Sequence, residues 1–144
     1  MAITFNNIDR KYPLSNKLII KKIINEIVSR ETLKTGHINI IICSDDYLLK
    51  INKEYLNHDY YTDIITFNYN EGATINGDLF ISLDMVENNS EKFKTSLELE
   101  LSRVIFHGIL HLCGYNDKNE KEKAIIRQEE DKNLERYMFH VKQN

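Results

Sequence analysis

Residues 97–112 constrain the fold most strongly, because this long apolar segment carries two histidines. Its apolar side chains point around the whole circumference of a helix, which predicts a helix that is buried on most sides. His107 and His111 are four residues apart, so their imidazoles lie on one helical face, one turn apart. This spacing is typical of two ligands to a single metal ion. A lone buried histidine is more often satisfied by a carbonyl or a carboxylate, and that alternative stays open for each residue taken singly.

The residues after the helix supply a candidate third ligand. Gly114 is expected to end the helix, because helices commonly end with a glycine in the left-handed conformation. The chain can then turn back and bring Asp117 to the same ion, which would leave a fourth zinc position open, as in catalytic sites. Asp117 can instead cap the final helix, with Glu120 three residues later. Cys113 is a rival ligand, but it projects away from the histidine face and is more simply a small buried thiol.

The chain as a whole has the composition of a folded globular protein. Its 144 residues, 42% of them hydrophobic and 28% charged, suit one domain over residues 1–144. No apolar run approaches the length of a membrane span, and the first residues lack the features of a secretory signal. Cys43 and Cys113 are too few for a disulfide framework. A reduced cytoplasmic setting without membrane contact is therefore expected.

Charge gives no general sign of nucleic-acid binding. The net charge is −3 and the isoelectric point is about 6.0, so any basic footprint must be local. Lysines cluster in two places, which the simpler interpretation treats as solvated helix faces: Lys17, Lys21, Lys22, and Lys118, Lys121, Lys123.

Hydrophobic periodicity and turn residues predict an α+β fold, with helices packed on a small mixed β-sheet and the metal-binding helix in the core. Strands are expected over residues 2–5, 38–43, 64–69 and 77–82, with a hairpin loop over 70–76. Five helices are expected. The first begins at a cap at Ser15, and the second runs from a cap at Ser44 or Asp45 to about residue 56. The third begins at residue 83 and breaks near Asn88 and Asn89, and the last two cover residues 97–112 and about 119–137.

Three segments together resemble the YbeY family of bacterial rRNA maturation endoribonucleases. The family pattern is His-Gly-x-Leu-His-Leu-x-Gly-x-Asp-His, and residues 107–115 are similar to it. Gly77–Ser82 and Asn52–Phe67 resemble two further family segments, so the similarity spans nearly the whole chain. The resemblance implies a small α+β metalloprotein that binds zinc and acts on RNA.

The sequence departs from the family pattern at two positions. Asp117 stands where the family has its third histidine, and aspartate is also an acceptable zinc ligand. Leu56 stands where the family usually has an arginine, which would suit phosphate recognition. His58 lies close by and is a candidate substrate-binding residue, although an ordinary role in the loop is the simpler interpretation.

Three functions remain to be weighed. The leading hypothesis is a single-strand-specific, zinc-dependent endoribonuclease that acts on rRNA precursors and ribosomal subunits in rRNA maturation and ribosome quality control. The second is a non-catalytic ribosome-assembly factor whose metal stabilises the fold. The third is a zinc peptidase, but the peptidase motif needs a glutamate after the first histidine and this chain has Gly108 there.

Overall fold

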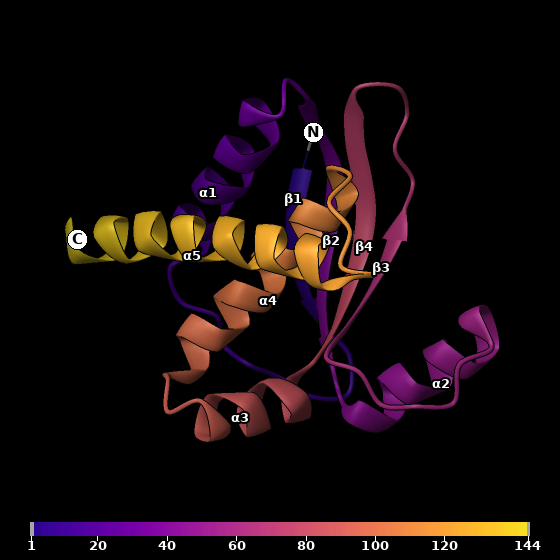
Figure 1. Cartoon of the computed structure of the whole chain (residues 1–144). Coiled ribbons are helices and arrows are strands. Elements are labelled where there is room, and N and C mark those ends of the chain that lie inside the picture. Colours follow the sequence, from indigo (N-terminus) through magenta and orange to yellow (C-terminus); the bar gives the residue numbers. More distant parts are fainter. Residues whose placement is uncertain (1, 144) are drawn as a thin grey trace.

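The computed structural model describes residues 2–143, in which helices pack on a four-stranded sheet (Figure 1). The elements follow one another along the chain as β1 (Ala2–Asn7), α1 (Lys17–Arg30), β2 (Lys34–Cys43), α2 (Asp45–Leu56), β3 (Ile64–Asn68), β4 (Thr74–Ser82), α3 (Leu83–Lys92), α4 (Leu97–Leu112) and α5 (Glu120–Gln143). The strand order is β1-β2-β4-β3. The β1–β2 and β2–β4 pairs are parallel, and β3 and β4 form an antiparallel hairpin. The predicted α+β fold with a mixed sheet is confirmed.

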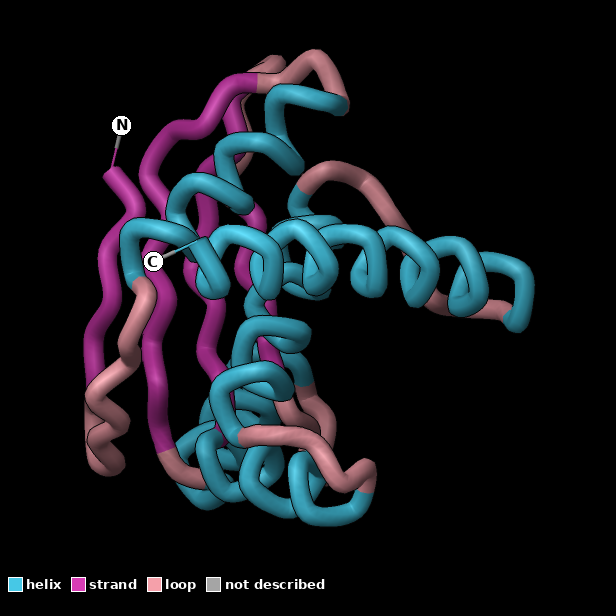
Figure 2. The backbone as a smooth tube through the Cα atoms, turned by 90° about the vertical axis from the view of Figure 1, so that its left-hand side faces the viewer, coloured by secondary structure: helices cyan, strands magenta, loops and turns pink. Residues whose placement is uncertain are grey.

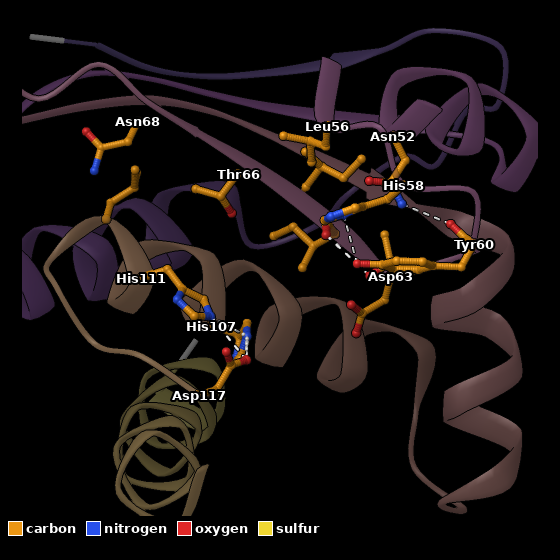
Figure 3. Close-up of a pocket in the computed structure, with 14 residues that line it drawn as sticks. Asn52, Leu56, His58, Tyr60, Asp63, Thr66, Asn68, His107, His111 and Asp117 are labelled. Atoms are coloured by element: carbon orange, nitrogen blue, oxygen red, sulfur yellow. Dashed lines mark hydrogen bonds and ion pairs between the residues drawn. The ribbon is translucent and has the colours of Figure 1, made fainter. Parts of the chain in front are cut away.

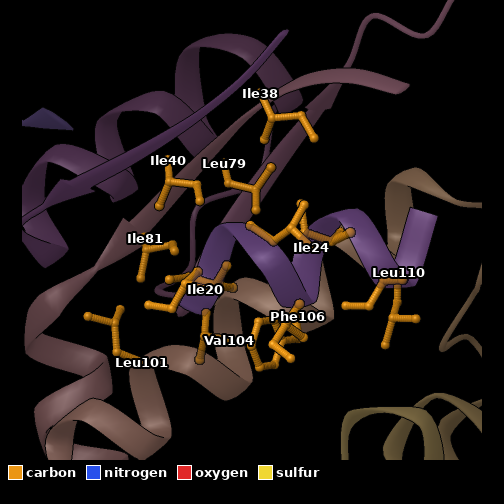
Figure 4. Close-up of a cluster of buried hydrophobic side chains, with 14 of the residues drawn as sticks. Ile20, Ile24, Ile38, Ile40, Leu79, Ile81, Leu101, Val104, Phe106 and Leu110 are labelled. Atoms are coloured by element: carbon orange, nitrogen blue, oxygen red, sulfur yellow. The ribbon is translucent and has the colours of Figure 1, made fainter. Parts of the chain in front are cut away.

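The two faces of the sheet bury different sets of side chains, because successive residues of a strand point to opposite faces. Ile38, Ile40, Leu79 and Ile81 belong to the larger core cluster, which also includes residues of α1, α4 and α5 (Figure 4). Figure 2 shows these helices on one side of the strands. A smaller cluster includes residues of α2 and the alternate positions of the strands: Cys43, Leu48, Ile51 and Ile65.

Helix α4 has the bounds predicted from the sequence and is buried along most of its length. The Ser96 side chain caps its first turn by accepting a hydrogen bond from the Leu99 amide. At Gly108 the helix lies close to the sheet, since an added Cβ atom would meet Leu79 Cδ2 at 2.7 Å and Ile64 Cδ1 at 2.8 Å. This close approach places the histidine end of α4 beside β3 and β4.

Helix α5 starts near the end of α4 and crosses the molecule, so that the C-terminus and α2 lie on opposite sides (Figure 1). It continues to Gln143, six residues beyond the predicted end at Tyr137, with Tyr137 packed edge-on against Phe106. Within residues 2–143, no helix is both long and apolar enough to span a membrane.

Two predicted helix boundaries are wrong. Ser15 does not cap α1: the N-cap is Asn16, and the Ser15 hydroxyl instead donates a hydrogen bond to Glu98. The break predicted near Asn88 and Asn89 is absent, because α3 runs without interruption to Lys92. Asparagine has only a modest helix penalty, which the packing of buried residues such as Val86 outweighs.

The strands are longer than predicted at the ends where apolar residues are scarce. β1 continues to Asn7, and β2 begins at Lys34 rather than at Ile38. β4 begins at Thr74, which shortens the hairpin loop expected over residues 70–76. These extensions form because the residues pair with a neighbouring strand, and their side chains show no pattern from which that pairing could be predicted.

Candidate metal centre

The backbone after α4 ends in the conformation that the sequence predicted. Gly114 has φ +106° and follows the C-cap residue Cys113. The Gly114 amide donates to the His111 carbonyl at 3.0 Å and the Tyr115 amide donates to the Leu110 carbonyl at 3.0 Å. These two bonds form a Schellman motif, which reverses the chain direction and returns residues 115–117 towards the histidine face.

This reversal brings together side-chain atoms of His107, His111 and Asp117 (Figure 3). The two Nε2 atoms are 3.0 Å apart. Asp117 Oδ2 lies 3.5 Å from His107 Nε2 and 3.3 Å from His111 Nε2. All three side chains are half-buried, so the group is reachable from solvent. The three residues can hold a metal ion.

The dimensions of this triangle fit a zinc ion. Ligand atoms about 2.0–2.2 Å from a tetrahedral zinc ion lie about 3.4 Å from one another. The three measured separations, 3.0, 3.3 and 3.5 Å, are close to that value. Two imidazole nitrogens and one carboxylate oxygen also match the ligand types of catalytic zinc sites.

A buried carboxylate fixes the orientation of His107. Glu130 of α5 is only 5% exposed, and its Oε2 lies 2.5 Å from His107 Nδ1. A proton on Nδ1 that is donated to Glu130 leaves the lone pair of Nε2 facing His111 and Asp117. Carboxylates commonly orient metal-binding histidines in this way. Glu130 is itself held by Arg103, whose Nη1 lies 3.3 Å from Glu130 Oε1.

The electrostatic surroundings favour positive charge at this point. Burial lowers the pKa of His107, but its hydrogen bond to Glu130 and the negative charges of Glu130, Asp63 and Asp117 outweigh burial, so the pKa is raised above its ordinary value. Carboxylates that stabilise an imidazolium ion also attract a metal cation at the same place.

Capping is not the role of Asp117. The Asn119 side chain caps α5, because its Oδ1 accepts a hydrogen bond from the Glu122 amide at 2.8 Å. The carboxylate of Asp117 faces the two histidines instead. The alternative that Asp117 caps the final helix is therefore wrong, and the cap lies two residues later, because asparagine is as good an N-cap as aspartate.

Cys113 lies outside the candidate metal group, as its position on the helix predicted. It is half-buried and packs against the main core. Burial raises the pKa of its thiol to about 12, so the thiolate that metals require is disfavoured.

A cavity of about 410 Å³ opens at the candidate metal group, and all three residues of the group line it. His107, His111 and Asp117 lie at one end, while Leu56 at the end of α2 and His58 and Tyr60 of the α2–β3 connection lie at the other (Figure 3). Asn52, Thr66 and Asn68 add polar groups to the lining. Among the described residues that line this cavity, none is a lysine or an arginine.

A second cavity of about 320 Å³ lies on the other side of the same group. Both cavities share Asp63, His107 and Asp117. The second cavity carries cations from α4 and α5, namely Arg103, Lys123 and Arg127.

Asp63 is a carboxylate that lines both cavities, a position that no pattern in the sequence predicted. Burial raises its pKa, and the charge of His107 opposes that effect only in part. Glu130 was also missed, because it lies 23 residues after His107 and in sequence resembles any other charged residue of an amphipathic helix. Asp63 lies within Asn52–Phe67, so the resemblance of that segment to the family was the signal that could have singled it out.

The peptidase hypothesis receives no support from the geometry. A peptidase would need a glutamate side chain after the first histidine to act as a base. Here that position, Gly108, packs against Leu79 and Ile64 of the sheet, so a side chain there would point into the core.

Comparison with known proteins assigns the family. The model of the family described as "Endoribonuclease YbeY" matches residues 3–138. The chain belongs to the endoribonuclease YbeY family. Among its relatives, endoribonuclease YbeY of Azobacteroides pseudotrichonymphae is 48% identical over 94% of this chain and 98% of its own. That of Phocaeicola vulgatus is 54% identical over 77% of this chain and 80% of its own.

A solved structure supports the same assignment. The solution structure of TM1509 from Thermotoga maritima is similar to this chain with a TM-score of 0.68 and 29% sequence identity. The similarity covers 99% of this chain and 93% of that one. The resemblance noted in the sequence is therefore confirmed at the level of family and fold.

Proposed function

We propose that the protein is a metal-dependent, single-strand-specific endoribonuclease that acts in rRNA maturation and ribosome quality control. The observation that carries this proposal is the triangle of His107 Nε2, His111 Nε2 and Asp117 Oδ2, which lies at one end of an open cavity. Membership of the endoribonuclease YbeY family supports RNA as the substrate. Its substrates would be rRNA precursors and ribosomal subunits in the cytoplasm.

Zinc is the metal that the ligand set favours, with one ion per chain held by His107, His111 and Asp117. A zinc ion bound there would polarise a phosphoryl oxygen or lower the pKa of a water molecule. Glu130 keeps the Nδ1 proton of His107 on its own side, so that Nε2 faces the site, and Arg103 in turn holds the Glu130 carboxylate in position.

Asp63 is the carboxylate that we assign to proton transfer. It borders both cavities beside His107, so a phosphodiester bound across the metal group would lie next to it. Its raised pKa makes it a better proton acceptor than an ordinary aspartate. In this role Asp63 would take the proton of the attacking hydroxyl group, whether that group belongs to water or to a ribose.

An open cavity next to the metal group suits single-stranded RNA. Unpaired nucleotides can turn their bases out of the strand and into a protein cavity, whereas the bases of a duplex are stacked and paired. We therefore expect cleavage in single-stranded or irregular regions.

A non-catalytic assembly factor is the second candidate, and two observations favour it. The protein is acidic, with a net charge of −3, and Leu56 cannot bind phosphate where the family usually has an arginine. In that case the metal would serve stability alone.

Cleavage of RNA by the purified protein separates the two candidates. Zinc-loaded protein should cut a labelled single-stranded RNA, stop after chelation and recover when zinc is added back. A duplex of the same sequence should resist cleavage, and Asp63→Asn should retain zinc but cut far more slowly. Zinc-loaded, folded protein that binds ribosomal subunits without cutting any RNA would overturn the nuclease in favour of the assembly factor.

A further inference from the structure

The cavity beside the metal group has aromatic rather than basic chemistry at its far end. His58 and Tyr60 line it, and Tyr60 is 55% exposed. No lysine or arginine occurs among the described residues of its lining, so phosphate charge has no cationic side chain to meet there. A ligand that enters this end must be recognised through its rings or its polar edges.

The two rings are held in place before any ligand arrives. They are stacked, with centroids 5.1 Å apart and planes inclined by 22°. The Tyr60 hydroxyl and His58 Nδ1 share a hydrogen bond at 2.9 Å. A pair that is already fixed loses little conformational entropy when a third ring stacks on it.

A buried residue anchors the loop that carries the pair. Asn52 of α2 is 1% exposed, and its Nδ2 donates to the Tyr60 carbonyl at 2.9 Å. The Asn52 carbonyl accepts the His58 amide at 3.1 Å. One residue therefore fixes the backbone at both His58 and Tyr60, although both side chains are exposed to solvent.

We propose that the His58–Tyr60 pair is a stacking platform for one base of the RNA strand whose phosphate lies at the metal group. This inference rests on the proposed function and adds how the substrate is held. Stacking on an aromatic side chain strengthens binding and tolerates any base, because every base has a flat π-face. A platform of this kind selects unpaired nucleotides and not a particular sequence. It also supplies affinity at the end of the cavity where Leu56 offers no charge.

The neighbouring residue provides a matched control. Tyr61 is 53% exposed, almost the same as Tyr60, but it does not line the cavity, and its hydroxyl lies 3.4 Å from Asp46 Oδ1. Tyr60→Ala removes the platform ring. Tyr60→Phe keeps the ring and loses only the bond to His58, while Tyr61→Ala removes an equally exposed ring outside the cavity.

Binding is measured by fluorescence anisotropy. The probe is a single-stranded RNA of about eight nucleotides that carries 2′-O-methyl groups. The same oligonucleotide with abasic positions keeps every phosphate and lacks bases. We expect Tyr60→Ala to weaken binding of the intact strand about tenfold at every salt concentration, because stacking involves no counterion release. Tyr61→Ala should bind like the wild type, Tyr60→Phe should lose much less affinity than Tyr60→Ala because it keeps the ring, and the abasic strand should not distinguish any of these variants.

Equal affinity of folded Tyr60→Ala and wild type for the intact strand would overturn the platform, as would equal loss in Tyr61→Ala. Thermal melting establishes that each variant is folded. If the wild type cuts RNA and Tyr60→Ala binds normally, only the platform fails. If the zinc-loaded wild type neither cuts nor binds RNA, the proposed function fails and the platform fails with it.

Discussion

Two cavities meet at Asp63, His107 and Asp117, and their chemistry differs on either side of this boundary. The first, towards the α2–β3 connection, is aromatic and amide-rich, with no lysine or arginine among its described lining residues. The second, bordered by α3, α4 and α5, contains three cations, Arg103, Lys123 and Arg127, beside the carboxylates of Glu100 and Glu130. For the proposed RNA substrate, this difference predicts that bases enter the first cavity and that phosphates approach the cations of the second.

The cations of the second cavity are not equivalent. Arg103 contacts Glu130 at 3.3 Å and Asp131 at 3.0 Å. Its charge is therefore already paired with carboxylates, one of which orients His107. Arg127 is 3.9 Å from Glu130, at the outer limit of an ion pair, and its side chain is exposed. Lys123 has a similarly loose partner in Glu120 at 3.8 Å. Lys123 and Arg127 are therefore the cations of this cavity that are available to bind a phosphate.

The largest effect should come from the residue that supports the metal group from the second cavity. Glu130→Gln keeps the shape of the side chain but removes its charge and its preference for a protonated His107 Nδ1. We expect zinc affinity to fall about 10–100-fold, as is usual when such a supporting carboxylate is lost. Competition titration with a zinc chelator measures the change.

Glu129→Gln is the control for Glu130→Gln, because Glu129 is on the same helix and pairs with Lys132 rather than with His107. Unchanged zinc affinity in a folded Glu130→Gln variant would contradict the orienting role.

Leu56→Arg would introduce a cation into the cavity that lacks one. Leu56 is 41% exposed and lines this cavity, so the arginine can reach it without burying its charge. We expect RNA binding to tighten several-fold at low salt and the gain to shrink as salt rises, because phosphate contacts release counterions. Unaltered affinity across a salt series, in a variant with normal thermal melting, would show that phosphates do not pass this position.

Removing a cation from the second cavity should have a smaller effect of the opposite sign. Arg127→Ala should weaken RNA binding uniformly over different sequences and lower the salt dependence by about one phosphate contact. Lys132→Ala removes a cation farther along α5 as the control. If the control lowers the salt dependence as much as Arg127→Ala does, the charge acts at long range and the second cavity holds no particular phosphate.

The smallest effect concerns pH. The pKa of His107 is raised in the folded protein, so protonation stabilises the metal-free protein below the unfolded pKa of about 6.5, and this contribution is lost as pH rises through the folded value. Metal-free protein should therefore melt at a lower temperature as pH rises through this range. Zinc-loaded protein should show the reverse, since zinc binds only unprotonated imidazole. The same trend in metal-free His107→Gln would assign the effect to another group.

Much of the fold could be predicted because α4 carries unusually strong signals. Its apolar residues and Gly114 agree, and its predicted bounds are the observed ones. Other boundaries depended on weaker signals. Ser15 is a good cap by type, but its hydroxyl is used by a glutamate more than eighty residues away. Local sequence does not report such long-range partners.

The candidate site also has a part that could be predicted from the sequence and a part that could not. His107, His111 and Asp117 lie within eleven residues, so helical spacing and one glycine turn were enough to predict that they would meet. Glu130 reaches the site only because α5 packs against α4, and His58 and Tyr60 only because α2 ends opposite the metal group. These contacts arise from packing between elements, which periodicity within one element cannot predict.

Zinc content most directly tests the claim that three residues hold one ion between the two cavities. Elemental analysis of purified wild-type protein should give about one zinc per chain, and Asp117→Ala should lose most of it while remaining folded. Asp117→His should retain zinc, because imidazole is also a zinc ligand and the family pattern has histidine at this place. Full zinc occupancy in Asp117→Ala would contradict the account, since the ion would then be held without the carboxylate that faces both histidines.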